Sequence, residues 1–143
     1  MSSVDRSIEW SRTGVGGGIG RGPVYPILGE SATLQAGLRS DEWGDGPWGG
    51  QKVLWFVHQR YLGPVLIRGR RLGGWQLMRF DRGPRPSDEI RIARGESVSW
   101  TGQPRGSRGR PSYVRVRAPG CYGVQIDGAS FSRIIVFRVT LTR

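Results

Sequence analysis

From residue 51 onward, short runs of apolar and β-branched residues recur at regular spacing, separated by glycine- and proline-rich turns. Such runs, bounded by turn residues, are typical of β-strands. The expected strands span residues 51–59, 65–72, 75–80, 89–93, 97–101, 112–118, 121–127 and 132–141. No window keeps a helical period with capping signals, so the pattern predicts an all-β sandwich or barrel.

The first of these strands is apolar on both of its faces. Val53, Trp55 and Val57 share one face, because successive side chains point to opposite sides of a strand. Leu54 and Phe56 occupy the other face. A half-exposed strand would carry polar residues at these two positions, so the second face is expected to be covered.

The last strand repeats this pattern. Ile135, Phe137 and Val139 lie on one face, and Ile134 and Val136 lie on the other. The cover over these second faces is either the irregular N-terminal third of the chain or another protein. We favour the N-terminal third, because exposed apolar patches are rare on soluble monomers.

If a partner protein supplies the cover, arginines flank the apolar residues that it would contact. In the strand at residues 112–118, arginines alternate with Val114 and Val116, which predicts that the arginines face solvent. The predicted protein interface consists of Leu54, Phe56, Ile134 and Val136, with Arg68, Arg70, Arg115 and Arg117 as its polar rim.

Residues 1–50 differ in character from the rest of the chain. We expect them to form an irregular segment, rich in glycine and tryptophan, that packs on or extends from a β-sandwich domain at residues 51–143. Residues 14–23 are dense in glycine and are expected to be a flexible or tightly packed connector. Residues 24–28 and 31–35 are candidate edge segments.

The size and composition fit one β-rich domain. A chain of 143 residues can bury a core, and 24 glycines with nine prolines suit a fold with many turns. No window has the length and apolarity of a transmembrane helix, and the first residues lack the basic start and apolar run of a signal peptide. Cys121 is the single cysteine, which excludes an intramolecular disulfide.

The chain carries a net charge of +11, and Lys52 is the only lysine among its 22 basic residues. An excess of this size fits a surface that binds polyanions such as nucleic acid or anionic lipid. It also fits an arginine-rich composition with no such ligand, because the arginines are spread along the chain. The residues of a polyanion- or carbohydrate-binding alternative are Trp43, Trp48, Arg105, Arg108 and Arg110.

Each part of that alternative also has a structural interpretation. Trp43 and Trp48 lie in a glycine-rich loop, where aromatic rings can serve as platforms for sugars or nucleobases. Loop tryptophans also close the open end of a sandwich, and we favour this interpretation because tryptophan rarely stays exposed without a partner. The arginines at residues 105–110 form either a flexible anion-binding arm or a polar loop.

The sequence contains no recognisable catalytic constellation. The glycine run lacks the Gly-Lys-Ser/Thr of a phosphate loop and the strand–helix context of a dinucleotide site. No Gly-x-Ser-x-Gly elbow occurs, and His58 is the single histidine, so a multi-histidine metal site is not expected. We therefore predict no catalytic residues, no metal site, no cofactor and no enzymatic activity.

The C-terminal block Pro-Gly-Cys-Tyr-Gly-Val-Gln-Ile-Asp-Gly-Ala-Ser-Phe-Ser-Arg-Ile-Ile-Val-Phe at 119–137, with Pro-Ser-Tyr at 111–113, resembles a group of uncharacterised small bacterial proteins. Lys-Val-Leu-Trp-Phe at 52–56 and Gly-Pro-Val-Leu-Ile-Arg-Gly-Arg-Arg-Leu at 63–72 look similar to the same group. The resemblance covers residues 48–139. It implies an immunoglobulin-like antiparallel β-sandwich and an exported, lipid-anchored or cell-envelope location, and it carries no activity.

The function expected from these observations is a non-enzymatic accessory or structural subunit that binds another protein at the cell envelope. The alternative is a binding module for polyanions, such as nucleic acid or anionic lipid, or for carbohydrate.

Overall fold

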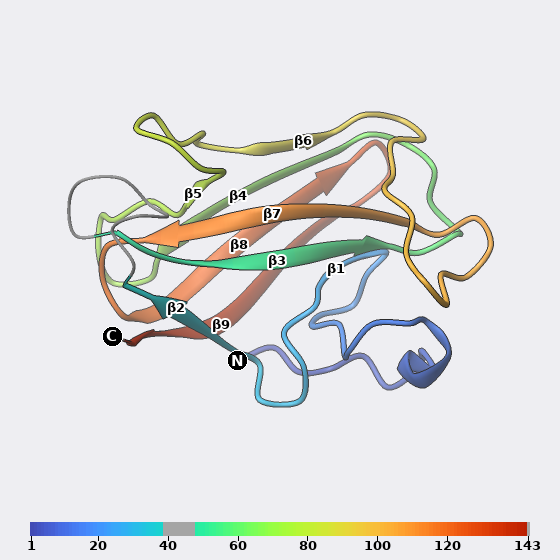
Figure 1. Ribbon diagram of the computed structural model, residues 1–143, viewed down its shortest axis with the longest axis horizontal. Coiled ribbons are helices and arrows are strands. Elements are labelled where there is room, and N and C mark those ends of the chain that lie inside the picture. Colours follow the sequence, from blue (N-terminus) through green and yellow to red (C-terminus); the bar gives the residue numbers. More distant parts are fainter. Residues whose placement is uncertain (39–47, 143) are drawn as a thin grey trace.

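The computed structural model describes residues 1–38 and 48–142, which form a nine-stranded sheet and one short 3₁₀ helix, η1 (Trp10–Arg12) (Figure 1). The strands are β1 (Val24–Pro26), β2 (Thr33–Gly37), β3 (Gly49–Val57), β4 (Val65–Arg71), β5 (Arg79–Phe80), β6 (Ile90–Ile92), β7 (Arg108–Val116), β8 (Gly120–Gly128) and β9 (Ser132–Thr142). The described part of the chain contains no α-helix, so the predicted all-β class is confirmed.

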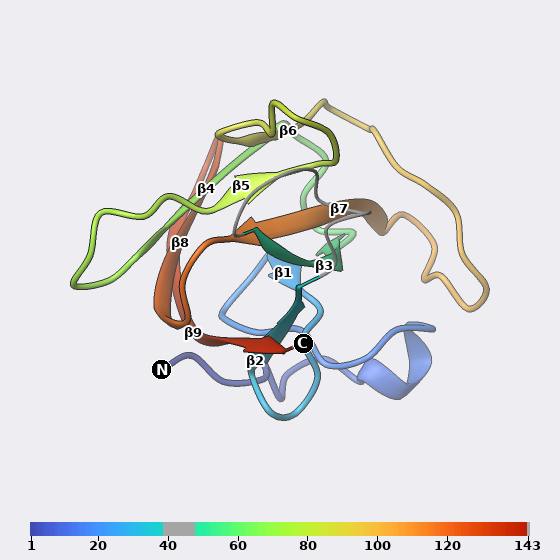
Figure 2. The same ribbon diagram turned by 60° about the vertical axis from the view of Figure 1, so that its left-hand side comes forward.

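The sheet is rolled into a nearly closed, barrel-like wall. Neighbouring strands follow the order β5–β7–β3–β2–β9–β8–β4–β6, and β1 adds to β3. The two edge strands, β5 and β6, come near each other and leave one unsealed seam (Figure 2). The loop between them narrows this seam, because Phe80 and Ser87 exchange two backbone hydrogen bonds.

The antiparallel arrangement that the sequence predicts is wrong at one position, because β2 runs parallel to β9. The register places Thr33 opposite Arg138 and Gly37 opposite Thr142. β2 also pairs with β3, in antiparallel fashion, through Gly37 and Gly50. β2 therefore links the two halves of a mixed sheet. Alternation along a strand does not reveal this, since side chains alternate in the same way in both directions.

Two of the predicted strands are shortened or absent. Residues 75–80 form only β5, and Leu77 adds an isolated bridge to Arg70. Residues 97–101 form no strand, although Val98 donates one backbone hydrogen bond to Gly109 of β7. Turn residues flank both segments and limit their pairing to a few positions.

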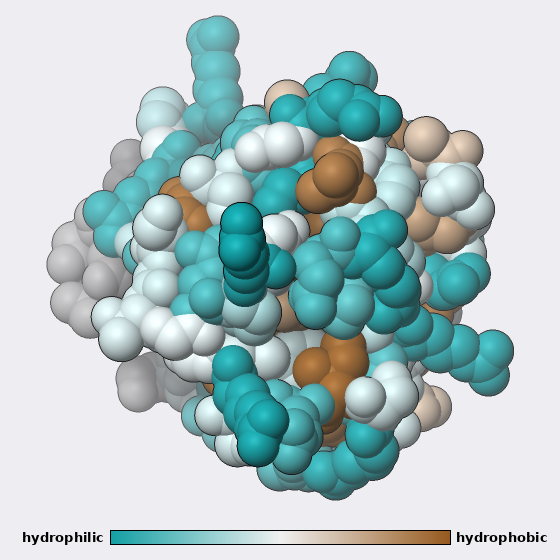
Figure 3. Space-filling view, turned by 90° about the vertical axis from the view of Figure 1, so that its right-hand side faces the viewer, coloured by the Kyte–Doolittle hydropathy of each residue, from teal (hydrophilic) through white to brown (hydrophobic). Residues whose placement is uncertain are grey.

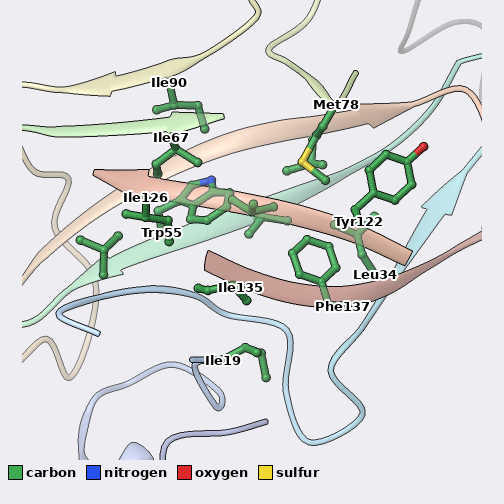
Figure 4. Close-up of a cluster of buried hydrophobic side chains, with 14 of the residues drawn as sticks. Ile19, Leu34, Trp55, Ile67, Met78, Ile90, Tyr122, Ile126, Ile135 and Phe137 are labelled. Atoms are coloured by element: carbon green, nitrogen blue, oxygen red, sulfur yellow. The ribbon is translucent and has the colours of Figure 1, made fainter. Parts of the chain in front are cut away.

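The core occupies the interior of the wall, and the sequence pattern predicts which faces line it. The three alternating apolar residues of β3 and those of β9 are all buried there, with Ile67, Tyr122 and Ile126 from β4 and β8. Figure 4 shows these side chains converging from several strands. Burial of each such side chain stabilises the fold by about 1.5–3 kcal/mol.

The N-terminal third completes the wall between β3 and β9. β1 pairs with the last three residues of β3, and three further steps of backbone hydrogen bonding lead from β1 across to β9. In the first step, Ile19 donates to Pro26 and Leu28 donates to Gly17. In the second step, Asp5 donates to Gly18 and Gly20 donates to Ser3. In the third step, Ser2 donates to Val136 of β9. Residues 1–28 thus fill the gap that β2 leaves open, because β2 meets β3 at a single residue pair.

The side chains of this segment belong to the core and not to a layer lying over it. Val4, Ile19 and Val24 are buried, and Ile19 joins the same cluster as Ile135 and Phe137 (Figure 4). The N-terminal third therefore contributes to the wall in the way that a set of short strands would.

Glycine at position 18 is required by the close packing of this segment. A Cβ atom there would lie 2.4 Å from the Trp10 ring and 2.7 Å from the Cβ of Tyr25. The Trp10 indole consequently rests against bare backbone, and its ring meets Tyr25 and Phe56 edge-on, at centroid distances of 5.2 and 5.4 Å. The glycine-dense connector is tightly packed at this point.

A partly buried polar contact anchors the same segment. Tyr25 donates a hydrogen bond of 2.6 Å to the Asp5 carboxylate, and Ser7 donates two more, from its backbone nitrogen and its hydroxyl. Burial raises the pKa of Asp5, but the hydrogen bonds from Ser7 and Tyr25 outweigh it and leave this pKa below its ordinary value of 3.8. Burial, with the bond to Asp5, raises the pKa of Tyr25 to about 12.

Replacement of Asp5 by asparagine should weaken this anchor. Because the folded-state pKa of Asp5 lies below its unfolded value, its contribution is present above pH 3.8 and is lost as the pH falls through the lower folded value. We expect Asp5→Asn to lower the free energy of unfolding at pH 7 by about 1–2 kcal/mol. Urea unfolding across pH 2–7 should show the difference from wild type shrinking in acid, and a constant difference would contradict this role.

Candidate binding surfaces

The predicted interface residues fall on two separate parts of the molecule. Phe56 lies on the outer side of β3, but it is only 1% exposed, because Trp10, Tyr25 and Trp100 surround it. Leu54, on the same side, is half-buried. Over β3 the cover thus comes from the chain itself, and Phe56 is not available to a partner.

The outer side of β9 is different. Ile134 is 63% exposed in the first part of the strand. Val136 is half-buried, and Ser2 bonds to both its backbone oxygen and its backbone nitrogen. The N-terminal segment therefore reaches the free edge of β9 and leaves Ile134 open.

Two of the four predicted rim arginines lie beside Ile134. β4, β8 and β9 are neighbours in the sheet (Figure 2), and their register places Arg68 opposite Gln125, which lies opposite Ile134. Arg68 and Arg70 are both exposed on β4. Arg68 approaches Asp127 of β8 at 4.0 Å.

Two exposed leucines that the sequence pattern did not single out complete this surface. Leu72 and Leu77 are each 44% exposed, and with Arg68, Arg70, Gln125 and Ile134 they line a shallow depression of about 390 Å³. Gly123 forms its floor. A Cβ atom there would lie 3.0 Å from Leu72, so the missing side chain lets the leucine rest on β8. We call these six lining residues, with Gly123, the outer face.

The other two predicted rim arginines lie elsewhere. Arg115 is only 1% exposed, and its guanidinium donates hydrogen bonds to the backbone oxygens of Asp81 and Gly83. The loop after β5 folds over this side of β7, which is why the alternation with Val114 and Val116 does not leave Arg115 in solvent. Burial lowers the pKa of Arg115, and the nearby charge of Arg117 adds to this effect.

Trp48 makes cation–π contacts with Arg115 and with Arg117. The Arg115 guanidinium carbon lies 5.0 Å from the centre of the Trp48 ring, and that of the exposed Arg117 lies 4.3 Å from it. Trp48 itself is buried. Trp43, the other loop tryptophan considered above, lies outside the described residues.

The arginines at residues 105–110 do not form a flexible arm. Arg108 is only 3% exposed, and its guanidinium donates hydrogen bonds to the backbone oxygens of Ala93, Tyr61 and Gly63. Arg110 is half-buried beside Glu96, at 3.3 Å. Arg105 is exposed. Arg108 and Arg110 therefore hold the first residues of β7 against the neighbouring loops. In Figure 3, hydrophilic residues separate small apolar areas on the face toward the viewer.

A second hollow, which the sequence did not indicate, lies near Trp48. Trp75 is 79% exposed and lines a recess of about 360 Å³ together with Trp48, Arg79 and Arg117. Trp75 follows the Gly-Gly pair of the hairpin between β4 and β5. Its place at a turn is a sequence signal for exposure, but the pattern assigns it to the start of a strand.

The polar residues considered for chemistry are not brought together. His58 accepts a hydrogen bond from the backbone nitrogen of Arg60, and burial, followed by the charge of Arg60, lowers its pKa. Cys121 is half-buried on β8, opposite Arg138 of β9. Among residues 1–38 and 48–142, no group of three histidine, cysteine or acidic side chains could hold a metal ion, and no helix could span a membrane.

Loss of the Arg108 side chain should destabilise the fold, because three backbone oxygens would lose a charged donor inside the protein. We expect Arg108→Ala to lower the free energy of unfolding by about 3 kcal/mol. Arg105→Ala, its exposed neighbour, should change it by less than about 0.5 kcal/mol. Chemical denaturation of the two variants tests this, and equal effects would show that Arg108 is not a structural anchor.

No protein-family model matches the chain, and no curated protein matches its sequence. Among solved structures, a family 123 glycoside hydrolase from Clostridium perfringens is similar in part, with a TM-score of 0.36 and 10% identity. The match covers 80% of this chain and 23% of the hydrolase chain. A likeness this distant assigns the chain neither a family nor an activity.

Proposed function

We propose that this chain is a non-enzymatic accessory or structural subunit that binds another protein through its outer face. The observation that carries the proposal is the exposure of Ile134, at 63%, beside the exposed Leu72 and Leu77. These three exposed aliphatic side chains leave apolar surface in contact with water, which burial against a partner would remove. Neighbouring aliphatic side chains at one place mark an interaction site more often than scattered ones do.

The energetics favour a partner that covers all three side chains together. Complete burial of a fully exposed aliphatic side chain contributes about 1.5–3 kcal/mol, and these three, which are 44–63% exposed, would each contribute about half of that. Loss of translational and rotational freedom costs about 4–15 kcal/mol, so the aliphatic cluster alone gives weak binding. The polar residues around it must therefore contribute to affinity and specificity.

The charge around the cluster indicates what the partner presents. Arg68 and Arg70 lie beside Ile134, and Arg138 is exposed further along β9, whereas the acidic residue Asp127 lies 4.0 Å from Arg68. A partner surface with an apolar centre and carboxylates at its margin would complement this face. A second copy of the chain would bring arginine against arginine, which disfavours self-association here.

Two features of the proposal rest on the resemblance to small exported bacterial proteins. One is location at the cell envelope. The other is an immunoglobulin-like sandwich as the finer description of the sheet. Its support is the strand order, in which β5–β7–β3 and β9–β8–β4–β6 form two groups linked through β2.

A polyanion-binding role is the second candidate, and the excess of positive charge favours it. Six carboxylates among the described residues are ion-paired with arginines, at Arg6–Glu30, Arg12–Glu9, Arg68–Asp127, Arg79–Asp88, Arg91–Glu89 and Arg110–Glu96. With a net charge of +11, the remaining arginines form the excess. Nucleic-acid binding that weakens steeply with salt would favour this candidate over the first.

Replacement of Ile134 by aspartate should abolish partner binding without unfolding the protein, because the side chain is exposed. The matched control is Leu62→Asp, at another exposed aliphatic residue that does not line the outer face. Crosslinked complexes from native extract should contain the same partner with wild type and Leu62→Asp, and should lose it with Ile134→Asp. Retention of that partner by Ile134→Asp, or a monomer that crosslinks to nothing, would contradict the proposal.

Reversal of charge at Arg70 should weaken the same complex if the partner is acidic at its margin. We expect Arg70→Glu to reduce the affinity for the identified partner by about tenfold and to make binding less sensitive to salt. Arg94→Glu, at an exposed arginine that does not line the outer face, supplies the control for net charge. Equal losses with both variants would indicate general electrostatics in place of a specific rim.

A further inference from the structure

We propose that the recess between Trp48, Trp75 and Arg117 binds an acidic sugar, a pyranose ring that carries a carboxylate, as part of an acidic polysaccharide. This site is separate from the outer face and does not depend on the proposed protein partner. The two share only Leu77 among their lining residues.

Trp75 supplies the apolar platform. Its side chain is 79% exposed at the edge of a recess of about 360 Å³. An indole offers a large, flat and rigid apolar face with few rotatable bonds, so it can pack against a ligand at low conformational cost. The C–H face of a pyranose ring is apolar and of similar width, and it fits such a surface.

Arg117 supplies the charge that a carboxylate requires. Its guanidinium carbon lies 4.3 Å from the centre of the Trp48 ring, and this cation–π contact restrains the guanidinium while the side chain remains exposed. A guanidinium that is already oriented can form two parallel hydrogen bonds to a carboxylate with less loss of entropy. The Arg115 guanidinium carbon, 5.0 Å from the centre of the same ring, adds to the positive potential near the recess.

The walls of the recess are rigid, which favours a binding site. Pro84 and Pro86 line it, and proline fixes its own backbone angle φ. The loop that carries them is fastened to β7, because Arg115 donates hydrogen bonds to the backbone oxygens of Asp81 and Gly83. The buried arginine thus holds the loop in the position that the recess requires.

The side chains here suit an acidic sugar better than a single nucleic-acid strand. Strand binding uses successive aromatic platforms along a basic groove, and this recess offers one exposed ring. A neutral sugar would form no ion pair with Arg117. A small carboxylate would leave Trp75 uncovered. The acidic pyranose meets both requirements at one position.

The experiment measures binding of tetragalacturonate to the full chain by isothermal titration calorimetry. Maltotetraose serves as the neutral oligosaccharide and an eight-residue oligothymidylate as the nucleic acid. We expect tetragalacturonate to bind at least about tenfold more tightly than either. We also expect Trp75→Ala to weaken this binding by about tenfold, and Arg117→Gln to reduce affinity for tetragalacturonate to that for maltotetraose.

The control variants are Leu62→Ala and Arg94→Gln, both exposed and outside the recess. They should bind tetragalacturonate as wild type does, and thermal unfolding should confirm that all four variants fold. Preferential binding of the oligothymidylate would overturn the proposal in favour of nucleic acid. Absence of tetragalacturonate binding, equal binding of the neutral tetramer, or full binding by Trp75→Ala would overturn it outright. None of these results depends on the outer face, since its side chains are unchanged.

Discussion

The fold depends on the backbone hydrogen bonds through which residues 1–28 close the wall between β3 and β9. β2 meets β3 at the single pair Gly37–Gly50, so without these residues the buried faces of β3 and β9 would open to water along most of their length. An open sheet edge also leaves backbone donors and acceptors unpaired. The glycines of this segment allow close approach, and the bond from Tyr25 to Asp5 fixes its polar side. Residues 1–28, β3 and β9 are distant in sequence, and backbone hydrogen bonds join them into one continuous wall.

The path of residues 1–28 explains why the outer side of β3 is covered, whereas the outer side of β9 is open at Ile134. The N-terminal segment passes η1 over β3, where Trp10 covers Phe56, and it ends at the free edge of β9 beside Val136. The apolar second faces of β3 and β9 look equivalent in sequence, but they differ in exposure. The cover over β3 is intramolecular, and Ile134 remains exposed.

Alternation along single strands predicted the parts of the fold that depend on local sequence. It identified the inward faces of β3 and β9 and most of the strands, because burial on one face imposes a period of two. It did not predict the parallel pairing of β2 with β9, the burial of Arg115 or the exposure of Trp75. The first two depend on segments far away in the chain. Trp75 is exposed at the turn that follows Gly73 and Gly74, where the pattern assigned it to a strand. Of the predicted interface, Ile134, Arg68 and Arg70 lie together, whereas Phe56 and Arg115 are buried.

Buried arginine links the structural and functional parts of the molecule. Arg108 and Arg115 sit near opposite ends of β7, and each donates to backbone oxygens of a loop. A guanidinium has five donors in a fixed plane, so it can satisfy several loop carbonyls that would otherwise lack partners. The arginine-rich composition is therefore partly structural. The charge available for binding is carried by arginines that remain at the surface, such as Arg70 and Arg117, each placed beside exposed apolar side chains. Binding sites on this chain are accordingly to be sought where arginine and exposed apolar surface coincide, and net charge alone does not locate them.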